Sequence, residues 1–131
     1  MITYRKYRLA DEKAFRTMSN DEWRPAHDSI AGSMRRQKRN VESCYVAVDK
    51  DKVIGYAYGF ILPNETLIAD FIYVRPEYRR QGVGRGVLEA LERGSGCSCS
   101  MAFYNKALHE HYKKLGYSTG ENLEVAIKQI R

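Results

Sequence analysis

The chain has 131 residues, 44% of them hydrophobic, and a formal net charge of +6. This length predicts one domain over residues 1–131, large enough to bury a substantial core. No apolar run approaches the ~20 residues of a membrane span and no secretory signal opens the sequence, so we expect a cytoplasmic protein without a membrane partner. Cys44, Cys97 and Cys99 lack metal-ligand spacing, and we expect reduced side chains and no bound metal.

The N-terminal half predicts three strands and two helices. In chain order they are a strand over 2–9, a short helix beginning near Asp11, a loop over 20–25, a helix carrying Ile30 and Met34, and strands over 44–48 and 53–62. In the last strand, large side chains at positions 54, 56, 58, 60 and 62 alternate with mostly smaller ones. We therefore expect one bulky core face and one face thin enough to admit a helix or a ligand.

The C-terminal half predicts a strand, a basic turn and further strands and helices. A strand over 66–74 precedes the turn, and a helix of about ten residues follows it, up to Gly94-Ser95-Gly96. A strand over 97–103 comes next, then a helix from Asn105, as the N-cap, to Leu115, and a last strand from Leu123 to Ile130.

The turn itself, Arg79-Arg80-Gln81-Gly82-Val83-Gly84, is the most informative segment. Glycines let a backbone approach a ligand closely, and the free amides of a helix N-terminus suit a phosphate. We therefore predict a pyrophosphate cradle formed by the amides from Arg80 to Arg85. A Walker A loop would need a Gly-Lys-Ser/Thr ending, and the dinucleotide fingerprint would need glycine where Val87 stands.

Two motifs in the same order resemble the GNAT (GCN5-related N-acetyltransferase) family. Arg79, Gly82 and Gly84 fill the pattern Arg/Gln-x-x-Gly-x-Gly/Ala, and Asn105 is followed seven residues later by Tyr112. The resemblance implies an α/β (α+β) single domain, with a mixed, mostly antiparallel twisted sheet flanked by helices in the order β-α-α-β-β-β-α-β-α-β. It also implies acetyl-CoA as the acetyl donor, an amine as the acceptor, and direct transfer in a ternary complex.

The resemblance also assigns the acetyl-CoA contacts. The pyrophosphate would lie on the cradle, the pantetheine alongside the end of the 66–74 strand, and the Val74 amide would face the developing oxyanion where that strand splays from its neighbour. Asn105 would bond the pantetheine arm. The cofactor-binding residues are then Ile72, Tyr73, Val74, Arg79, Arg80, Gln81, Gly82, Val83, Gly84, Arg85, Asn105 and Tyr112.

Asp70 and Tyr112 are the predicted catalytic residues. A lysine-like amine has a pKa of about 10.4, so freeing its lone pair at pH 7 costs roughly 4 to 5 kcal/mol and calls for a base. Asp70 suits that role, in register with Ile72 and Val74 if the strand is regular; a water chain, or a merely solvent-facing Asp70, is the alternative. Tyr112 would return a proton to the departing thiolate, with core packing as its alternative role.

The acceptor stays open at this stage. Asp21, Glu22, Asp28 and Asp70 would suit a cationic amine, and His27 beside them could line an acceptor pocket. A protein or aminoacyl-tRNA amine docked on the basic run 35–39 is an alternative, although nucleic acid is the lesser expectation. A non-catalytic acyl-CoA-binding module is a third reading, and a homodimer is compatible with all of them. Ser100 stands where relatives acting on a ribosomal N-terminus carry glutamate, which argues against that acceptor.

Overall fold

The computed structural model describes residues 1–36, 41–119 and 126–130, and its centre is a five-stranded sheet in the order β1-β2-β3-β4-β5. Neighbouring strands are antiparallel except that β5 runs parallel to β4. The strands are β1 (Ile2–Lys6), β2 (Glu42–Asp49), β3 (Lys52–Ile61), β4 (Thr66–Val74) and β5 (Cys99–Ala102). The expected mixed, mostly antiparallel sheet is confirmed.

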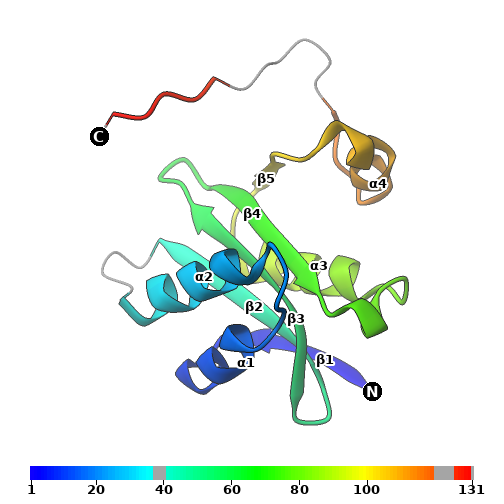
Figure 1. The fold of residues 1–131 in the computed structure, drawn as a ribbon. Coiled ribbons are helices and arrows are strands. Elements are labelled where there is room, and N and C mark those ends of the chain that lie inside the picture. The colour runs from blue at the N-terminus through cyan, green and yellow to red at the C-terminus, as the bar shows by residue number, and fades with distance from the viewer. Residues whose placement is uncertain (37–40, 120–125, 131) are drawn as a thin grey trace.

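Helices cover both faces of this sheet, as Figure 1 shows. The face under α1 (Glu12–Arg16) and α2 (Arg24–Arg36) holds a core that includes Phe15, Ile30 and Tyr56. The opposite face is covered by α3 (Val83–Ser95), whose Val87 and Leu91 pack on β3 and β4. The short α4 (His109–Lys114) follows β5. Single 3-10 turns lie at Leu9–Asp11, Pro76–Tyr78 and Lys106–Leu108.

The helix α3 lies very close to the sheet because two of its glycines, Gly86 and Gly94, face the strands. A Cβ added at Gly86 would overlap the ring of Tyr4 from β1, and one added at Gly94 would overlap the ring of Tyr45 from β2. Each tyrosine ring therefore occupies the volume that a side chain on α3 would need. The contact fixes the height of α3 above the sheet, and with it the position of the turn at its N-terminus.

Two bulges change the side-chain alternation that a regular strand would give. In β3, Val53 pairs with Val48 and Gly55 with Ala47, so Ile54 has no partner and packs toward α3. The expectation that Ile54 shares a face with Tyr56 was therefore wrong. In β4, Ala69 pairs with Gly59 and Phe71 with Tyr58, which leaves Asp70 as the extra residue.

Several predicted boundaries also moved. The helix after the turn has 13 residues instead of about ten, and the strand expected over 97–103 shortens to β5. The helix expected from Asn105 to Leu115 is a 3-10 turn followed by α4. Of the last expected strand, residues 123–125 lie outside the described residues, and 126–130 are not in a strand.

Candidate functional site

The strand β4 presents an open edge next to the glycine-rich turn. Within the described residues, β5 pairs with β4 only from Thr66 to Ala69, so residues 70–74 have a partner strand on the β3 side alone. The Arg75 amide donates to the Ile54 carbonyl of β3 at 2.8 Å. Because successive amides of a strand point to opposite edges, the Val74 amide points to the open side. A ligand can therefore bond to this edge as an added strand would.

The turn after β4 has the backbone of an anion site. Arg80 (φ 63°) and Gly82 (φ 79°) both adopt left-handed conformations, and such residues within a turn direct successive amides into one concavity. The first helical bond of α3 runs from the Gly86 amide to the Gly82 carbonyl at 3.0 Å. The amides of residues 83–85 are thus left free at the positive end of the helix dipole. These features suit a phosphate or pyrophosphate.

The arginine side chains around the turn are only partly available. The Arg79 guanidinium donates to the Val74 carbonyl at 2.8 Å and lies 5.3 Å from the centre of the Tyr73 ring. Arg85 forms an exposed ion pair with Glu89 at 3.0 Å. Of the predicted cofactor contacts, Arg79 therefore shapes the end of β4, and the anion site rests mainly on backbone amides.

Asp70 lies on the face of the sheet under α1 and α2, at the point where β4 and β5 separate. Burial, the hydrogen bond to Glu42 and the charge of Asp70 raise the pKa of Tyr58, which points to that face. The Asp70 side chain is exposed and makes no hydrogen bond or ion pair with any part of the chain that the structure describes. Partial desolvation nevertheless raises its pKa. The bulge thus separates Asp70 from Ile72 and Val74, which pack toward α3, and overturns the register expected for a regular strand.

Asn105 and Tyr112 belong to the 3-10 turn and to α4, which follow β5, and Figure 1 shows α4 at one end of the molecule. The Asn105 side chain accepts from the Ala107 amide at 2.9 Å, which confirms it as an N-cap. Tyr112 stacks on Tyr104, with ring centres 4.4 Å apart, and burial raises its pKa. Its recorded ring contacts are with Tyr104, His111 and Tyr117, so the structure does not itself bring Tyr112 together with Asp70.

Tyr117 ties the α4 region to the rest of the protein. Its hydroxyl donates to a Glu92 carboxylate oxygen on α3 at 3.0 Å and lies 2.7 Å from the Ser100 hydroxyl on β5. Ser100 is therefore engaged in a structural bond at the position singled out in the sequence.

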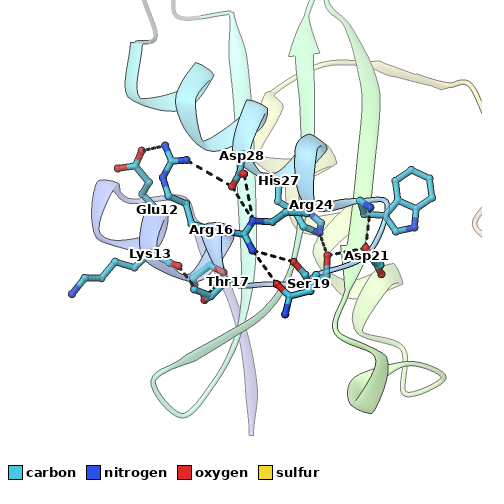
Figure 2. Close-up of polar contacts among 12 residues, drawn as sticks. Glu12, Lys13, Arg16, Thr17, Ser19, Asp21, Arg24, His27 and Asp28 are labelled. Carbon is cyan, nitrogen blue, oxygen red and sulfur yellow. Dashed lines mark hydrogen bonds and ion pairs between the residues drawn. The ribbon is translucent and has the colours of Figure 1, made fainter.

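A polar network organises the loop between α1 and α2 (Figure 2). His27 is fully buried, with Nδ1 2.7 Å from the Tyr56 hydroxyl and Nε2 3.0 Å from the Ser19 hydroxyl. Burial lowers its pKa, so His27 is neutral at pH 7 and joins the loop to β3. The expectation that His27 lines an acceptor pocket is not supported, because its ring is enclosed.

Two acidic residues that the sequence offered for a cationic acceptor, Asp21 in this loop and Asp28 on α2, are bonded within the protein. Asp28 lies 3.3 Å from Arg24 and 3.7 Å from Arg16. Asp21 accepts from the Trp23 amide at 2.9 Å and from the Ser19 hydroxyl at 3.0 Å. Asp28 is therefore not free to hold a cationic acceptor, in contrast to the expectation from the sequence.

The basic run 35–39 is only partly described. Arg35 pairs with Glu12 at 3.2 Å, and positions 37–39 lie outside the described residues. One of the two arginines of this run that the structure describes is therefore engaged in an ion pair within the protein.

The family of the chain follows from a sequence comparison. Residues 40–119, which contain the open strand and the turn, match the acetyltransferase (GNAT) domain. The chain belongs to the GNAT family. GNAT enzymes use acetyl-CoA as the donor, so this chain is an acetyl-CoA-dependent N-acetyltransferase.

Solved structures show the same GNAT fold at low identity. The aminoglycoside N-acetyltransferase AAC(6')-Iy in complex with CoA has a TM-score of 0.79 and 17% identity, over 98% of this chain and 95% of that one. The ribosomal-protein-alanine N-acetyltransferase from Brucella melitensis biovar Abortus 2308 has a TM-score of 0.75 and 13% identity, over 99% and 100%. The glucosamine-6-phosphate N-acetyltransferase from Arabidopsis thaliana has a TM-score of 0.66 and 15% identity, over 98% and 99%. The comparison with curated proteins gave no significant match.

Further properties of this GNAT chain concern metals and membranes. Across residues 1–36, 41–119 and 126–130, no group of three or more His, Cys, Asp or Glu side chains could hold a metal ion. No helix in those same ranges is long and apolar enough to cross a membrane. Trp23 was missed as a candidate site residue, although a lone tryptophan in a polar loop was a usable signal.

Proposed function

We propose that this GNAT enzyme transfers the acetyl group from acetyl-CoA directly to a primary amine of a small molecule or peptide, in a ternary complex. The observation that carries the proposal is the continuity of the open β4 edge with the amides of the turn. The edge offers hydrogen bonds to the amide groups of pantetheine, and residues 80–85 offer amides to its pyrophosphate. Of the cofactor contacts named from the sequence, those from Ile72 to Val74 and from Arg79 to Arg85 would follow that path, whereas Asn105 and Tyr112 come from the segment beyond β5.

The chemistry then needs a base, an oxyanion donor and an acid. Asp70, directly or through water, would accept a proton from the amine, whose nitrogen then attacks the thioester carbonyl carbon. The Val74 amide, which points to the open side, would stabilise negative charge on the carbonyl oxygen. As the carbon–sulfur bond breaks, Tyr112 would donate its proton to the thiolate. The role proposed for Tyr112 requires α4 to move toward the open edge of β4 when acetyl-CoA binds, since the ring contacts of Tyr112 are with Tyr104, His111 and Tyr117.

Initial-rate kinetics with free-thiol detection and an amine panel tests the proposal. A ternary complex predicts intersecting double-reciprocal lines when both substrates vary. Parallel lines would instead indicate an acetyl-enzyme and refute direct transfer. Acetyl-CoA binding without turnover of any amine would favour a non-catalytic module, and absence of binding would refute the cofactor placement.

The proposal also covers the setting of the enzyme. We assign residues 1–131 to one domain acting in the cytoplasm, since Cys44, Cys97 and Cys99 are free thiols suited to a reducing compartment. A homodimer is supported by exposed Met101 and Phe103 next to the unpaired side of β5, within the described sheet. Light scattering at several protein concentrations tests it, and a monomer throughout would refute it.

A further inference from the structure

The loop before α2 places a partly exposed tryptophan against the catalytic strand. The Trp23 amide is held by the Asp21 carboxylate at 2.9 Å, which fixes the backbone of the residue. The indole packs edge-on against Phe71 of β4, with ring centres 5.5 Å apart. In this position 45% of Trp23 is exposed. A large aromatic side chain so held costs little conformational entropy when it binds a ligand.

The bulge in β4 brings a carboxylate to the same surface. The extra residue of a bulge and the residue after it oppose a single partner, and here Asp70 and Phe71 both lie opposite Tyr58. The Phe71 ring also stacks toward Tyr56, on the face covered by α1 and α2. Trp23, Phe71 and Asp70 therefore form one continuous surface, which we call the aromatic floor.

The polar side chains around the floor are bound to one another, as Figure 2 shows. Arg24 bonds Asp28 at 3.3 Å and the Asn20 side chain at 3.1 Å. Ser19 is shared between Asp21 and His27. A ligand rich in hydroxyl groups would have to break these bonds in order to form its own. Within the aromatic floor, all of whose residues the structure describes, the groups left to bind a ligand are the two aromatic rings and the Asp70 carboxylate.

We infer that the aromatic floor binds the acceptor, and that the acceptor is a primary amine carried on a compact aromatic or apolar group. The inference rests on the proposed function. The apolar group would lie on Trp23 and Phe71, while the ammonium would reach Asp70 at the start of the open edge. The indole face also attracts an ammonium directly. Polyamines and hydroxyl-rich amino sugars fit this surface less well, because they bring little apolar area to the rings.

Binding can be read directly because Trp23 is the only tryptophan of the chain. Phenethylamine, spermidine and glucosamine are titrated into the protein with CoA present, and indole emission is followed. We expect a saturable change with phenethylamine at concentrations where spermidine and glucosamine cause none. A saturable change with either of those, but none with phenethylamine, would overturn the inference.

A kinetic comparison supplies the second readout. Trp23→Ala should raise the KM for phenethylamine about tenfold, from the loss of one aromatic contact, while Trp23→Phe should retain most of the affinity. The KM for acetyl-CoA should not change in either variant. Leu9→Ala removes a 67%-exposed apolar side chain outside the floor and serves as the matched control.

The acceptor site and the proposed function can be refuted separately. If some amine is acetylated but Trp23→Ala leaves its KM within twofold, the floor is not the acceptor site and the proposed function stands. If no amine is acetylated and acetyl-CoA does not bind, the proposed function fails; the fluorescence titration then still decides whether the floor binds an aromatic amine.

Discussion

Replacing the carboxylate of the bulge residue by an amide, Asp70→Asn, removes the proposed base but nearly keeps the shape of the side chain. The side chain is exposed and makes no hydrogen bond or ion pair with any described residue, so the nearly isosteric amide should leave the bulge intact. At pH 7 only about one in 2,500 molecules of a lysine-like amine is neutral, which is a cost of ~4.6 kcal/mol. General-base catalysis typically contributes ~10²–10⁴-fold, and we expect a loss of that order in kcat/KM.

The pH dependence of this loss distinguishes a base from a binding residue. At a pH below the amine pKa, each rise of one pH unit increases the neutral fraction of the amine about tenfold. The loss of kcat/KM in Asp70→Asn should therefore shrink as the pH rises from 7 toward 10. The assay is kcat/KM for one saturable amine, by free-thiol detection, in both proteins at each pH. A constant deficit across that range, or none at pH 7, would refute the role of Asp70 as the base.

A stability measurement controls for misfolding in the same variant. Desolvation raises the pKa of Asp70, so the folded state prefers its protonated form. The stability linked to this group is therefore present below the unfolded-state pKa and lost as the pH rises through the raised one. Asp70→Asn should melt at the same temperature as the parent or higher at pH 7, and a clear fall in Tm would show that the activity loss is structural.

Three further predictions concern the acid, the cradle and the sheet. Tyr112→Phe should lower kcat by ~10²–10⁴-fold with acetyl-CoA affinity nearly unchanged and no rescue at high pH, so full kcat would make Tyr112 a packing residue. Gly84→Glu should abolish acetyl-CoA binding in calorimetry, whereas Gly84→Ala, whose Cβ would lie 3.6 Å from Val74, should still bind it. Gly55→Ala would put a Cβ 2.6 Å from the Tyr73 carbonyl oxygen and should cost ~1–3 kcal/mol of unfolding free energy in denaturant titrations, so an unchanged midpoint would contradict the tight spacing of β3 and β4.

The glycine-rich turn and most of the helices and strands could be predicted from the sequence because their signals are local. Glycine spacing, a preceding β-branched strand and a following amphipathic helix lie within one segment, and in the structure Gly82 is the left-handed N-cap of α3. The faces of Ile54 and Asp70 could not be read in the same way. Each depends on one extra residue in a strand, and such a bulge is fixed by pairing with a neighbouring strand.

The acceptor side was the least predictable for a related reason. Asp28 looked available in the sequence, but Arg24 pairs with it within α2, and Arg16 reaches it only after α1 and α2 have packed together. His27 likewise looked like a loop histidine and became a buried one with two hydroxyl partners. Tertiary contacts determined which polar groups remained unused, and Trp23 stood out only once its exposure and its contact with Phe71 were known.

The close packing of α3 on Tyr4 and Tyr45 limits which amino acids can occupy the positions that are in contact. A residue larger than glycine at position 86 needs a side chain smaller than tyrosine at position 4. Positions 94 and 45 are related in the same way. These changes are tolerated only in pairs, although the members of each pair are far apart in the chain. An exchange in β1 that touches no ligand would tilt α3 and displace the amides at its N-terminus. In a mutational library, substitutions at Tyr4 would therefore register as defects in acetyl-CoA affinity.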